Sequence, residues 1–411
     1  MKKALLVLAA MAVAVGLSSC KKDDGGKDDG GKSDSSQTAP YALDLYWDSS
    51  WSGKLGIQMG SLSSDSSEKR MILGGVPLYV TGTNCYNLFV QCFEADNMQT
   101  GEIEATVKEL VANKVPIVRF SCGPYYASQM HYYTEQKTKY LQNLDYLANL
   151  CDEGHILLIP SFFWNTSCVP EYCGEDITAW GVESSKTFDF MKSYVADIVG
   201  TLKDHKCLAA WEFGNEFSLQ ADIGIAGYTQ IPATDVQTAY RGFANAVKAA
   251  DPEGRLICSG NSIMRNSQWH QFHEASWGTD SFAQYEEITD VMTPDPMKGM
   301  SEHIYEDSRS FSDLGDVNRT YQVIWAKRAA KDLGKVYYVG EFTGPKTASG
   351  DSAKVKAHYI VYYNQKVQIS MIWNYALRGN IEYSFKASDY DGFPFSMMRR
   401  YNEMYRKMKA E

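Results

Sequence analysis

Short apolar runs alternate with longer segments of helical spacing from about residue 72 to the end of the chain. Runs of strand length occur at residues 77–83, 115–120, 156–159, 208–213, 255–259, 336–340 and 367–373, and a further run ends at 302–305. The run at 156–159 is apolar at every position, as is typical of a parallel strand covered on both faces. The pattern therefore predicts eight strands, most of them buried.

Nearly every one of these runs is followed by apolar residues at helical spacing. The clearest helix has Phe188, Met191, Val195, Ile198 and Leu202 three or four positions apart. Similar patterns predict helices at 102–112, 140–151, around 240–247, 321–333, 353–365 and 397–408, whereas the pattern after the fifth strand is too weak to place one. Repeated strand–helix units of this kind predict an α/β fold, a closed (β/α)8 TIM barrel with a short N-terminal extension.

An open, doubly wound sheet is the competing fold. It would usually carry a glycine-rich phosphate loop after the first strand, and residues 81–85 (TGTNC) do not supply one. Ahead of the barrel, residues 41–59 include Trp47 and Trp51, and we expect a strand or hairpin there that caps the barrel. The polar residues 61–69 are expected to form a loop.

The start of the chain has the features of an export signal. Lys2 and Lys3 precede an apolar stretch at 4–16 that is too short to span a membrane comfortably. Residues 17–20 (LSSC) resemble the bacterial lipobox, which implies a lipoprotein signal peptide at 1–19 and lipidation of Cys20. An ordinary secretory signal with an incidental cysteine is the alternative.

The segment that follows is charged and rich in glycine, so residues 20–40 are expected to form a disordered tether. Its first residues resemble the Lys-Asp-Asp surface-export signals of lipoproteins in Bacteroidetes-type bacteria. That resemblance implies a lipid-anchored protein of the outer membrane, on the cell surface rather than on the periplasmic face. No later apolar run is long enough to cross a membrane, so the lipid would be its sole membrane contact.

Composition narrows the classes of partner. A formal net charge of −10 argues against nucleic acid, whose binding needs clustered Lys and Arg. The chain has 27 Tyr and 9 Trp, and aromatic faces are the surfaces on which sugars stack, although most of these side chains are expected to fill the core.

The cysteine pattern does not indicate a metal site. Of nine cysteines, Cys168 could pair with Cys173, or Cys85 with Cys92, in an exported protein, whereas Cys207 and Cys258 are expected to be buried thiols. No Cys-x-x-Cys or His-x-x-x-His spacing is present. We therefore expect neither a metal nor another cofactor.

Two carboxylates stand at the ends of two different predicted strands. The fourth strand runs into Asn215 and Glu216, and the seventh into Glu341. Active sites of (β/α)8 barrels form at the carboxyl ends of their strands, so these side chains should meet. Two facing carboxyl groups are what glycoside cleavage needs, one to protonate the leaving oxygen and the other to attack or stabilise the sugar carbon.

Other strand ends add polar and aromatic groups, and together the set resembles the motifs of glycoside hydrolase family 5, the cellulase and mannanase family of retaining barrel enzymes. The residues that carry the resemblance are, in chain order, Arg119, Asn215, Glu216, His303, Tyr305, Glu341 and Trp373. The resemblance covers about residues 72–411, each motif being short and the order of the set being its specific feature. Residues 41–411 would then form the catalytic domain.

The resemblance implies a role for each residue. Glu216 would be the acid/base and Glu341 the nucleophile; Asn215 would hold the 2-hydroxyl of the sugar. Tyr305 would donate a hydrogen bond to the nucleophile, His303 and Arg119 would order the carboxylates, and Trp373 would form the floor of the same subsite. At the end of the third strand the family often has a His, where this chain has Trp164-Asn165, and either residue could contact substrate there.

The carboxylate pair has physical requirements of its own. Retention of configuration needs the two groups about 5 Å apart, and one must be protonated while the other is ionised. We expect Arg119 to keep Glu341 charged and Glu216 to stay protonated until the glycosyl intermediate forms. A further carboxylate, Glu212, lies on the same strand as Glu216 and is interpreted as structural or supporting.

The sequence thus favours a retaining, endo-acting β-glycan hydrolase that acts on β-linked polysaccharide or oligosaccharide, and we expect it to be a monomer without a cofactor. A surface glycan-binding lipoprotein on a degenerate barrel is one alternative, although a binding protein has no need to keep both carboxylates. An exo-acting glycosidase of the same clan is another. The sugar, the linkage and the mode of attack depend on the loops around the cleft.

Overall fold

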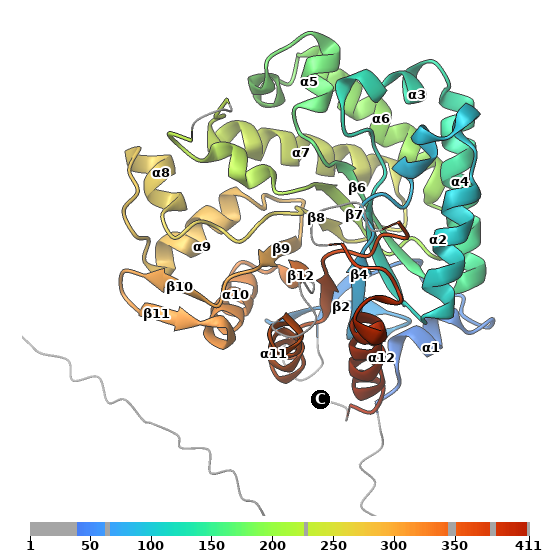
Figure 1. The fold of residues 1–411 in the computed structure, drawn as a ribbon. Helices are drawn as coiled ribbons and strands as arrows, with labels where there is room; N and C mark the ends of the chain where they lie inside the picture. Colours follow the sequence, from blue (N-terminus) through green and yellow to red (C-terminus); the bar gives the residue numbers. More distant parts are fainter. Residues whose placement is uncertain (1–38, 62–65, 226–228, 344–350, 379–383, 409–411) are drawn as a thin grey trace, which may run out of the picture. The chain divides into compact units, whose positions relative to one another are not determined.

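The computed structural model describes residues 39–61, 66–225, 229–343, 351–378 and 384–408 (Figure 1). The expected signal peptide, Cys20 and most of the expected tether lie outside these residues. Within them, no helix combines the length and the apolar character that a membrane span requires.

The described residues fold around a closed barrel of parallel strands, so the predicted fold is confirmed. Neighbouring strands follow the order β12-β13-β4-β5-β6-β7-β8-β9 around the barrel. Their bounds are β4 Val80–Asn84, β5 Ile117–Ser121, β6 Leu157–Phe163, β7 Trp211–Gly214, β8 Ile257–Cys258, β9 Gly299–Ile304, β12 Val336–Phe342 and β13 Ile369–Ile372. Every residue of these strands is buried, because helices cover the outside and side chains fill the inside.

Helices surround the barrel in the predicted alternation with the strands (Figure 1). They are α2 Gly101–Ala112, α3 His131–Thr134, α4 Lys137–Gly154, α5 Cys168–Cys173, α6 Lys186–Leu202, α7 Ala233–Ala250, α8 Gln268–Glu274, α9 Phe282–Val291, α10 Arg319–Asp332, α11 Asp351–Asn364 and α12 Phe393–Arg406. The region after the fifth barrel strand, where the pattern was too weak, holds the two helices α8 and α9. A hairpin of β10 Ser308–Phe311 and β11 Gly315–Asn318 follows β9.

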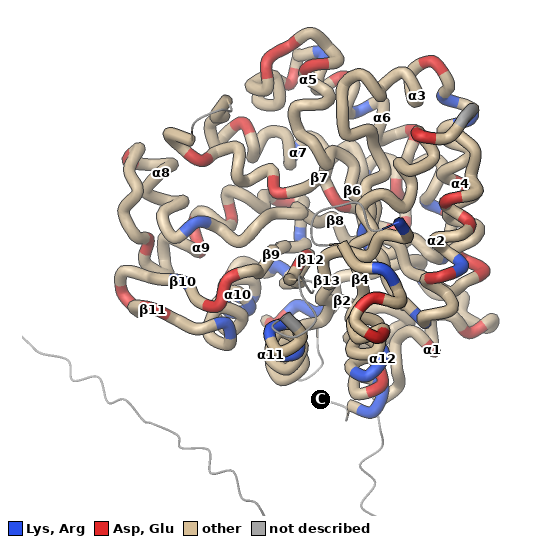
Figure 2. Tube along the Cα trace, viewed as in Figure 1, with Lys and Arg blue, Asp and Glu red and all other residues tan. Residues whose placement is uncertain are grey.

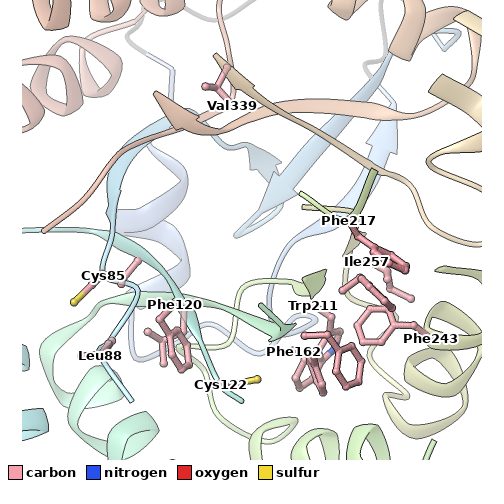
Figure 3. Close-up of a cluster of buried hydrophobic side chains, with 14 of the residues drawn as sticks. Cys85, Leu88, Phe120, Cys122, Phe162, Trp211, Phe217, Phe243, Ile257 and Val339 are labelled. Atoms are coloured by element: carbon pink, nitrogen blue, oxygen red, sulfur yellow. The ribbon is translucent and has the colours of Figure 1, made fainter. Parts of the chain in front are cut away.

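Aromatic packing joins the helices to the outside of the barrel. Phe162 of β6 packs against Phe243 of α7 at 5.1 Å between ring centroids and against Trp211 of β7 at 5.9 Å (Figure 3). The indole N–H of Trp211 donates to Asp251 at the end of α7 over 2.7 Å. The outer core is therefore continuous from strand to helix, and its burial is the main stabilising contribution to the fold.

The N-terminal end of the barrel has a separate apolar core that the segment before β4 closes. Ile57 inserts there, its N–H donating to Ala209 over 2.7 Å and its carbonyl accepting from Leu256 over 2.8 Å. Tyr46, which is fully buried, donates to the carbonyl of Lys206 at 2.7 Å. This cap leaves the opposite, carboxyl end of the strands as the place for polar groups.

The expected strand or hairpin at 41–59 is wrong in detail. Its first part is the helix α1 Ala42–Trp47, whose Ala42, Leu43 and Tyr46 are buried at helical spacing. The hairpin comes later, as β1 Gln58–Ser61 paired with β2 Lys69–Leu73, which also pairs with β3 Val76–Pro77. A six-residue helix has little intrinsic stability, so tertiary packing decided this segment.

Neither of the disulfides that the sequence left open is present among the described residues. All eight cysteines within the described residues are free, Cys85, Cys92, Cys168 and Cys173 among them. Cys168 and Cys173 are the first and last residues of α5, and five positions along a helix place two side chains on different sides of it. The expectation for Cys207 and Cys258 is confirmed, since both thiols are buried.

A histidine bridge joins α4 to the turn before β7. His205 contacts Asp152 through Nδ1 at 2.7 Å and Asp145 through Nε2 at 3.1 Å. The hydrogen bond to Asp152 raises the pKa of His205 above its ordinary value of 6.5. A raised pKa means that the stabilisation is fully present below about pH 6.5 and is lost as the pH rises through the folded-state pKa.

We expect His205→Gln to lower the free energy of unfolding by roughly 1 kcal/mol at pH 5.5 and by less at pH 9. Urea unfolding of both proteins at the two pH values measures the difference. A loss that is equal at both values, or larger at pH 9, would contradict the assignment.

Candidate active site

The residues expected at the strand ends do come together. Arg119 lies in β5, His303 in β9 and Glu341 in β12, while Glu216 directly follows β7. Tyr305 follows β9, and Trp373 follows β13. All these strands are parallel members of one barrel, so their carboxyl ends meet on one side of it.

The two glutamates face each other across a short gap. Carboxylate oxygens of Glu216 and Glu341 lie within 4.8 Å, and Nδ1 of His303 lies 2.9 Å from one and 3.5 Å from the other. This separation fits the spacing of about 5–5.5 Å found in retaining glycosidases and is shorter than the roughly 6.5–9.5 Å of inverting ones. A single sugar carbon could therefore lie within reach of both groups.

The backbone at Glu216 has a conformation that few residues other than glycine adopt. Its φ of 52° is in the left-handed region, and its N–H donates to the carbonyl of Gly260 at 2.8 Å. Gly260 itself has φ +71°, and a Cβ there would lie 1.9 Å from the carbonyl oxygen of Gly214. Close packing of these loops thus holds the turn that presents Glu216, and such positions are concentrated at functional sites.

A β-bulge turns Glu341 into the barrel. Val339 pairs with Glu302 of β9, but Glu341 pairs with the next residue, His303, so Gly340 is an extra residue in β12. A Cβ on Gly340 would lie 2.7 Å from Ser301 Oγ. Without the bulge, the period of two along a strand would place Glu341 on the same side as Val339, among the outer core residues.

Arg119 is fully buried and binds the surrounding strand ends together. Its Nε donates to Glu212 at 2.7 Å, its Nη1 to Glu341 at 2.7 Å and to Asn84 at 3.0 Å, and its Nη2 to Asn215 at 3.0 Å. Burial alone would lower the pKa of Arg119, but its two carboxylate partners raise it, so the guanidinium is charged. Tyr305 completes the surroundings of Glu341 by donating to its second oxygen at 2.5 Å.

Two residues of this network were not proposed from the sequence. Asn84 is the last residue of β4 and holds Arg119 through its amide oxygen, so the rule that polar strand ends meet would have found it. Tyr338 donates to Glu212 at 2.7 Å from inside β12, and no local signal separates it from the many core tyrosines. Asn165, considered for substrate contact, instead bonds the loop carbonyl of Tyr125.

The expected order of the two pKa values is wrong for the free protein. Burial raises the pKa of Glu341, which is 4% exposed, and Arg119 and His303 only partly offset this. Burial also raises the pKa of Glu216, but the hydrogen bond and charge of His303, together with Ser262 and Arg119, outweigh it and hold the pKa below the usual 4.5. These directions favour a shared proton on Glu341 in the free protein, because Glu341 is the more deeply buried of the two carboxyl groups.

The same groups have a spacing that would also suit a metal ion. Glu216, His303 and Glu341 each bring one ligand atom within 4.8 Å of the others. Both oxygens of Glu341, however, already accept hydrogen bonds, from Arg119 and from Tyr305. Protein donors thus already engage the oxygens of Glu341 that a metal ion would need as ligands.

An aromatic cleft of about 420 Å³ adjoins the pair. It is lined by residues after β4, β5, β6 and β13, which are Tyr86, Asn87, Val90, Gln91, Glu94, Tyr125, Tyr126, Gln129, Trp164 and Trp373. Trp164 lies over the guanidinium of Arg119 at 4.4 Å and beside Trp373 at 5.9 Å between ring centroids. Of the two residues considered at the end of the third barrel strand, Trp164 is therefore the one that lines the cleft.

Comparison with known proteins shows which solved structures share the barrel fold. No protein-family model matches the sequence, and no curated protein matches it. Among solved structures, the endo-1,4-beta-mannanase from Rhizomucor miehei is similar with a TM-score of 0.63 and 15% sequence identity, over 86% of this chain and 99% of that one. The endo-beta-1,4-mannanase from Thermotoga petrophila has a TM-score of 0.56 at 14% identity, over 81% and 78% of the two chains.

An exo-acting protein is among the similar structures too. The exo-beta-1,4-mannosidase from Opitutaceae bacterium strain TAV5 has a TM-score of 0.56 at 16% identity, over 83% of this chain and 63% of that one. At such identities the similarity demonstrates a shared barrel fold and no more.

We expect His303→Ala to raise the pKa of Glu216, because the substitution removes the group that lowers it. Carbon NMR titration of protein labelled at the glutamate carboxyl carbons measures the change, with Glu216→Gln to assign the signal. An unchanged or lower pKa in a folded variant would show that His303 does not control this carboxyl.

Proposed function

We propose that the chain is a retaining β-glycan hydrolase of the family 5 type. The observation that carries the proposal is the pair of Glu216 and Glu341, with carboxylate oxygens within 4.8 Å at the carboxyl ends of two barrel strands. Arg119, His303 and Tyr305 surround this pair with donors, as a reaction that forms and removes carboxylate charge requires.

The first step makes a glycosyl ester. An oxygen of Glu341 attacks the anomeric carbon as the glycosidic bond breaks, and Glu216 gives its proton to the departing oxygen, which leaves as an alcohol. In the second step, Glu216 takes a proton from water, the water oxygen attacks the same carbon, and Glu341 leaves as the free carboxylate. Configuration is retained because the carbon is inverted twice.

Substrate binding can place the proton correctly. The side chain of Glu216 is 27% exposed in the free protein, whereas that of Glu341 is 5% exposed. A sugar in the cleft removes water mainly from Glu216, and desolvation raises the pKa of a carboxyl group. The proton is thereby transferred toward Glu216, and esterification of Glu341 later removes the negative neighbour, so Glu216 can act as a base.

The substrate class follows from the cleft and the charge. The aromatic side chains that line the cleft offer flat apolar faces for sugar rings. The amide groups of Asn87, Gln91 and Gln129 offer hydrogen bonds to the sugar hydroxyls. Acidic and basic residues are interspersed over the outer helices (Figure 2), which does not fit a polyanion-binding face. The names of the similar structures favour β-1,4-mannan with endo action, and the resemblance to the cellulase and mannanase family adds cellulose-like glucan as the second candidate. Exo action remains the alternative because one similar structure is named an exo-mannosidase.

We further propose that Cys20 is lipidated and that the enzyme is held on the outer membrane, at the cell surface. Lipidation rests on the signal-like residues 1–20, and the cell-surface placement rests on the resemblance of the charged residues after Cys20 to surface-export signals. A lipid anchor would keep the hydrolysis products close to the cell.

We expect Glu341→Ala to reduce cleavage of an aryl β-glycoside by about 10⁴-fold or more, with azide restoring turnover and giving the α-glycosyl azide. Glu216→Ala with azide should give the β-product instead, because Glu341 still forms the ester. Activity of either variant near the normal rate would overturn the roles.

A screen of the unaltered protein on mannan, glucan, xylan and xyloglucan, with product sizing, tests the alternative. Binding of a glycan without release of product would favour a binding protein.

We expect Tyr126→Ala to raise KM for polysaccharide about fivefold while leaving turnover of a small aryl glycoside unchanged, because stacking in the cleft is worth about 1 kcal/mol. Tyr126 is 59% exposed and lines the cleft, and Tyr172 on α5, 43% exposed, is the matched control outside its lining. Equal effects of the two substitutions would show that the cleft does not hold the chain.

A further inference from the structure

A third carboxylate, Glu212, lies in β7, the strand that leads to Glu216. Its side chain is fully buried, and both of its oxygens are engaged. Oε1 accepts from Nε of Arg119 at 2.7 Å, and Oε2 accepts from the hydroxyl of Tyr338 at 2.7 Å. Glu212 does not line the aromatic cleft and its side chain is fully buried, so it does not reach a substrate there.

Arg119 consequently lies between two carboxylates. Its Nε binds Glu212 and its Nη1 binds Glu341, each at 2.7 Å, and the exposed fraction of its side chain is 0%. A guanidinium is planar and rigid, so the contact at Nε fixes the directions of the other two nitrogens. Those nitrogens point at Glu341 and at Asn215, two groups on which the proposed reaction depends.

We propose that Glu212 is a positioning residue that acts through Arg119, holding the guanidinium in place and sharing its charge with Glu341. The inference rests on the proposed function for its consequence in catalysis, but its effect on Glu341 is measurable without substrate. A carboxylate that served only to neutralise a buried arginine would affect stability and leave the titration of Glu341 unchanged.

The direction of the effect follows from the charges around Glu341. The titratable groups that face it are Arg119 from β5, Glu216 after β7, and His303 and Tyr305 at the end of β9, with Tyr338 below it on β12. Glu212→Gln keeps the size of the side chain and an oxygen acceptor but removes one negative charge next to the arginine. The positive charge of Arg119 is then opposed by Glu341 alone, so the ionised form of Glu341 becomes more favourable.

We expect Glu212→Gln to lower the pKa of Glu341 by about one unit, measured by carbon NMR titration of the free protein with Glu341→Gln to assign the signal. In the active enzyme, the pH optimum of kcat/KM should move to lower pH, since the optimum is the mean of the two pKa values of the pair. Glu302→Gln is the matched control: Glu302 is also buried and accepts from two tyrosines, Tyr285 and Tyr337, but it does not contact Arg119.

Glu212→Asp separates orientation from charge. It keeps the negative charge but shortens the side chain, so the pKa of Glu341 should stay within a few tenths of its normal value while kcat falls at least tenfold with little change in KM. If Glu212→Gln does not fold, Glu212→Asp still tests the proposal through its effect on kcat.

The inference is overturned if Glu212→Gln shifts the pKa of Glu341 no more than Glu302→Gln does, or if Glu212→Asp leaves kcat unchanged. A protein that cleaves none of the tested glycans would refute the proposed function, yet the shift in the Glu341 signal would still decide whether Glu212 controls that carboxyl through Arg119.

Discussion

The arrangement of side chains at the carboxyl end of the barrel depends on the burial of one positive charge, that of Arg119. An arginine without water must have all its donors matched and its charge compensated, or the fold loses several kcal/mol. Arg119 meets this requirement with partners from β4, β7 and β12, namely Asn84, Glu212 and Glu341. Satisfying one side chain thus brings three other strand ends to fixed positions around it.

The two carboxyl groups of the pair have unequal surroundings, and that inequality gives the site its chemistry. Glu341 is deep, set by a bulge in β12 and held by Arg119 and Tyr305. Glu216 is the more exposed of the two, on a left-handed turn beside His303. Because the shallow group is the one that a bound sugar would desolvate, the free and occupied sites can favour different positions for the same proton.

The two ends of the barrel divide stability from function. At the amino end of the strands, apolar side chains fill the interior. Ile57 closes this end through its main-chain hydrogen bonds, and Tyr46 of α1 does so through its hydroxyl. At the carboxyl end, charged and amide groups occupy the interior, and an aromatic cleft opens beside them. The burial of apolar side chains at the amino end stabilises the fold, and this offsets the cost of burying charged groups at the carboxyl end.

The sequence by itself determined the elements and the composition of the site. Apolar period and length predicted the eight strands and their helices, and strand-end position selected Arg119, Glu216 and Glu341 because parallel strand ends must meet. Tertiary structure alone decided the rest. The bulge at Gly340 that turns Glu341 inward, the partners of Arg119 and the order of the two pKa values depend on packing between residues far apart in the chain, and hydrogen bonding and burial there leave no local pattern to read.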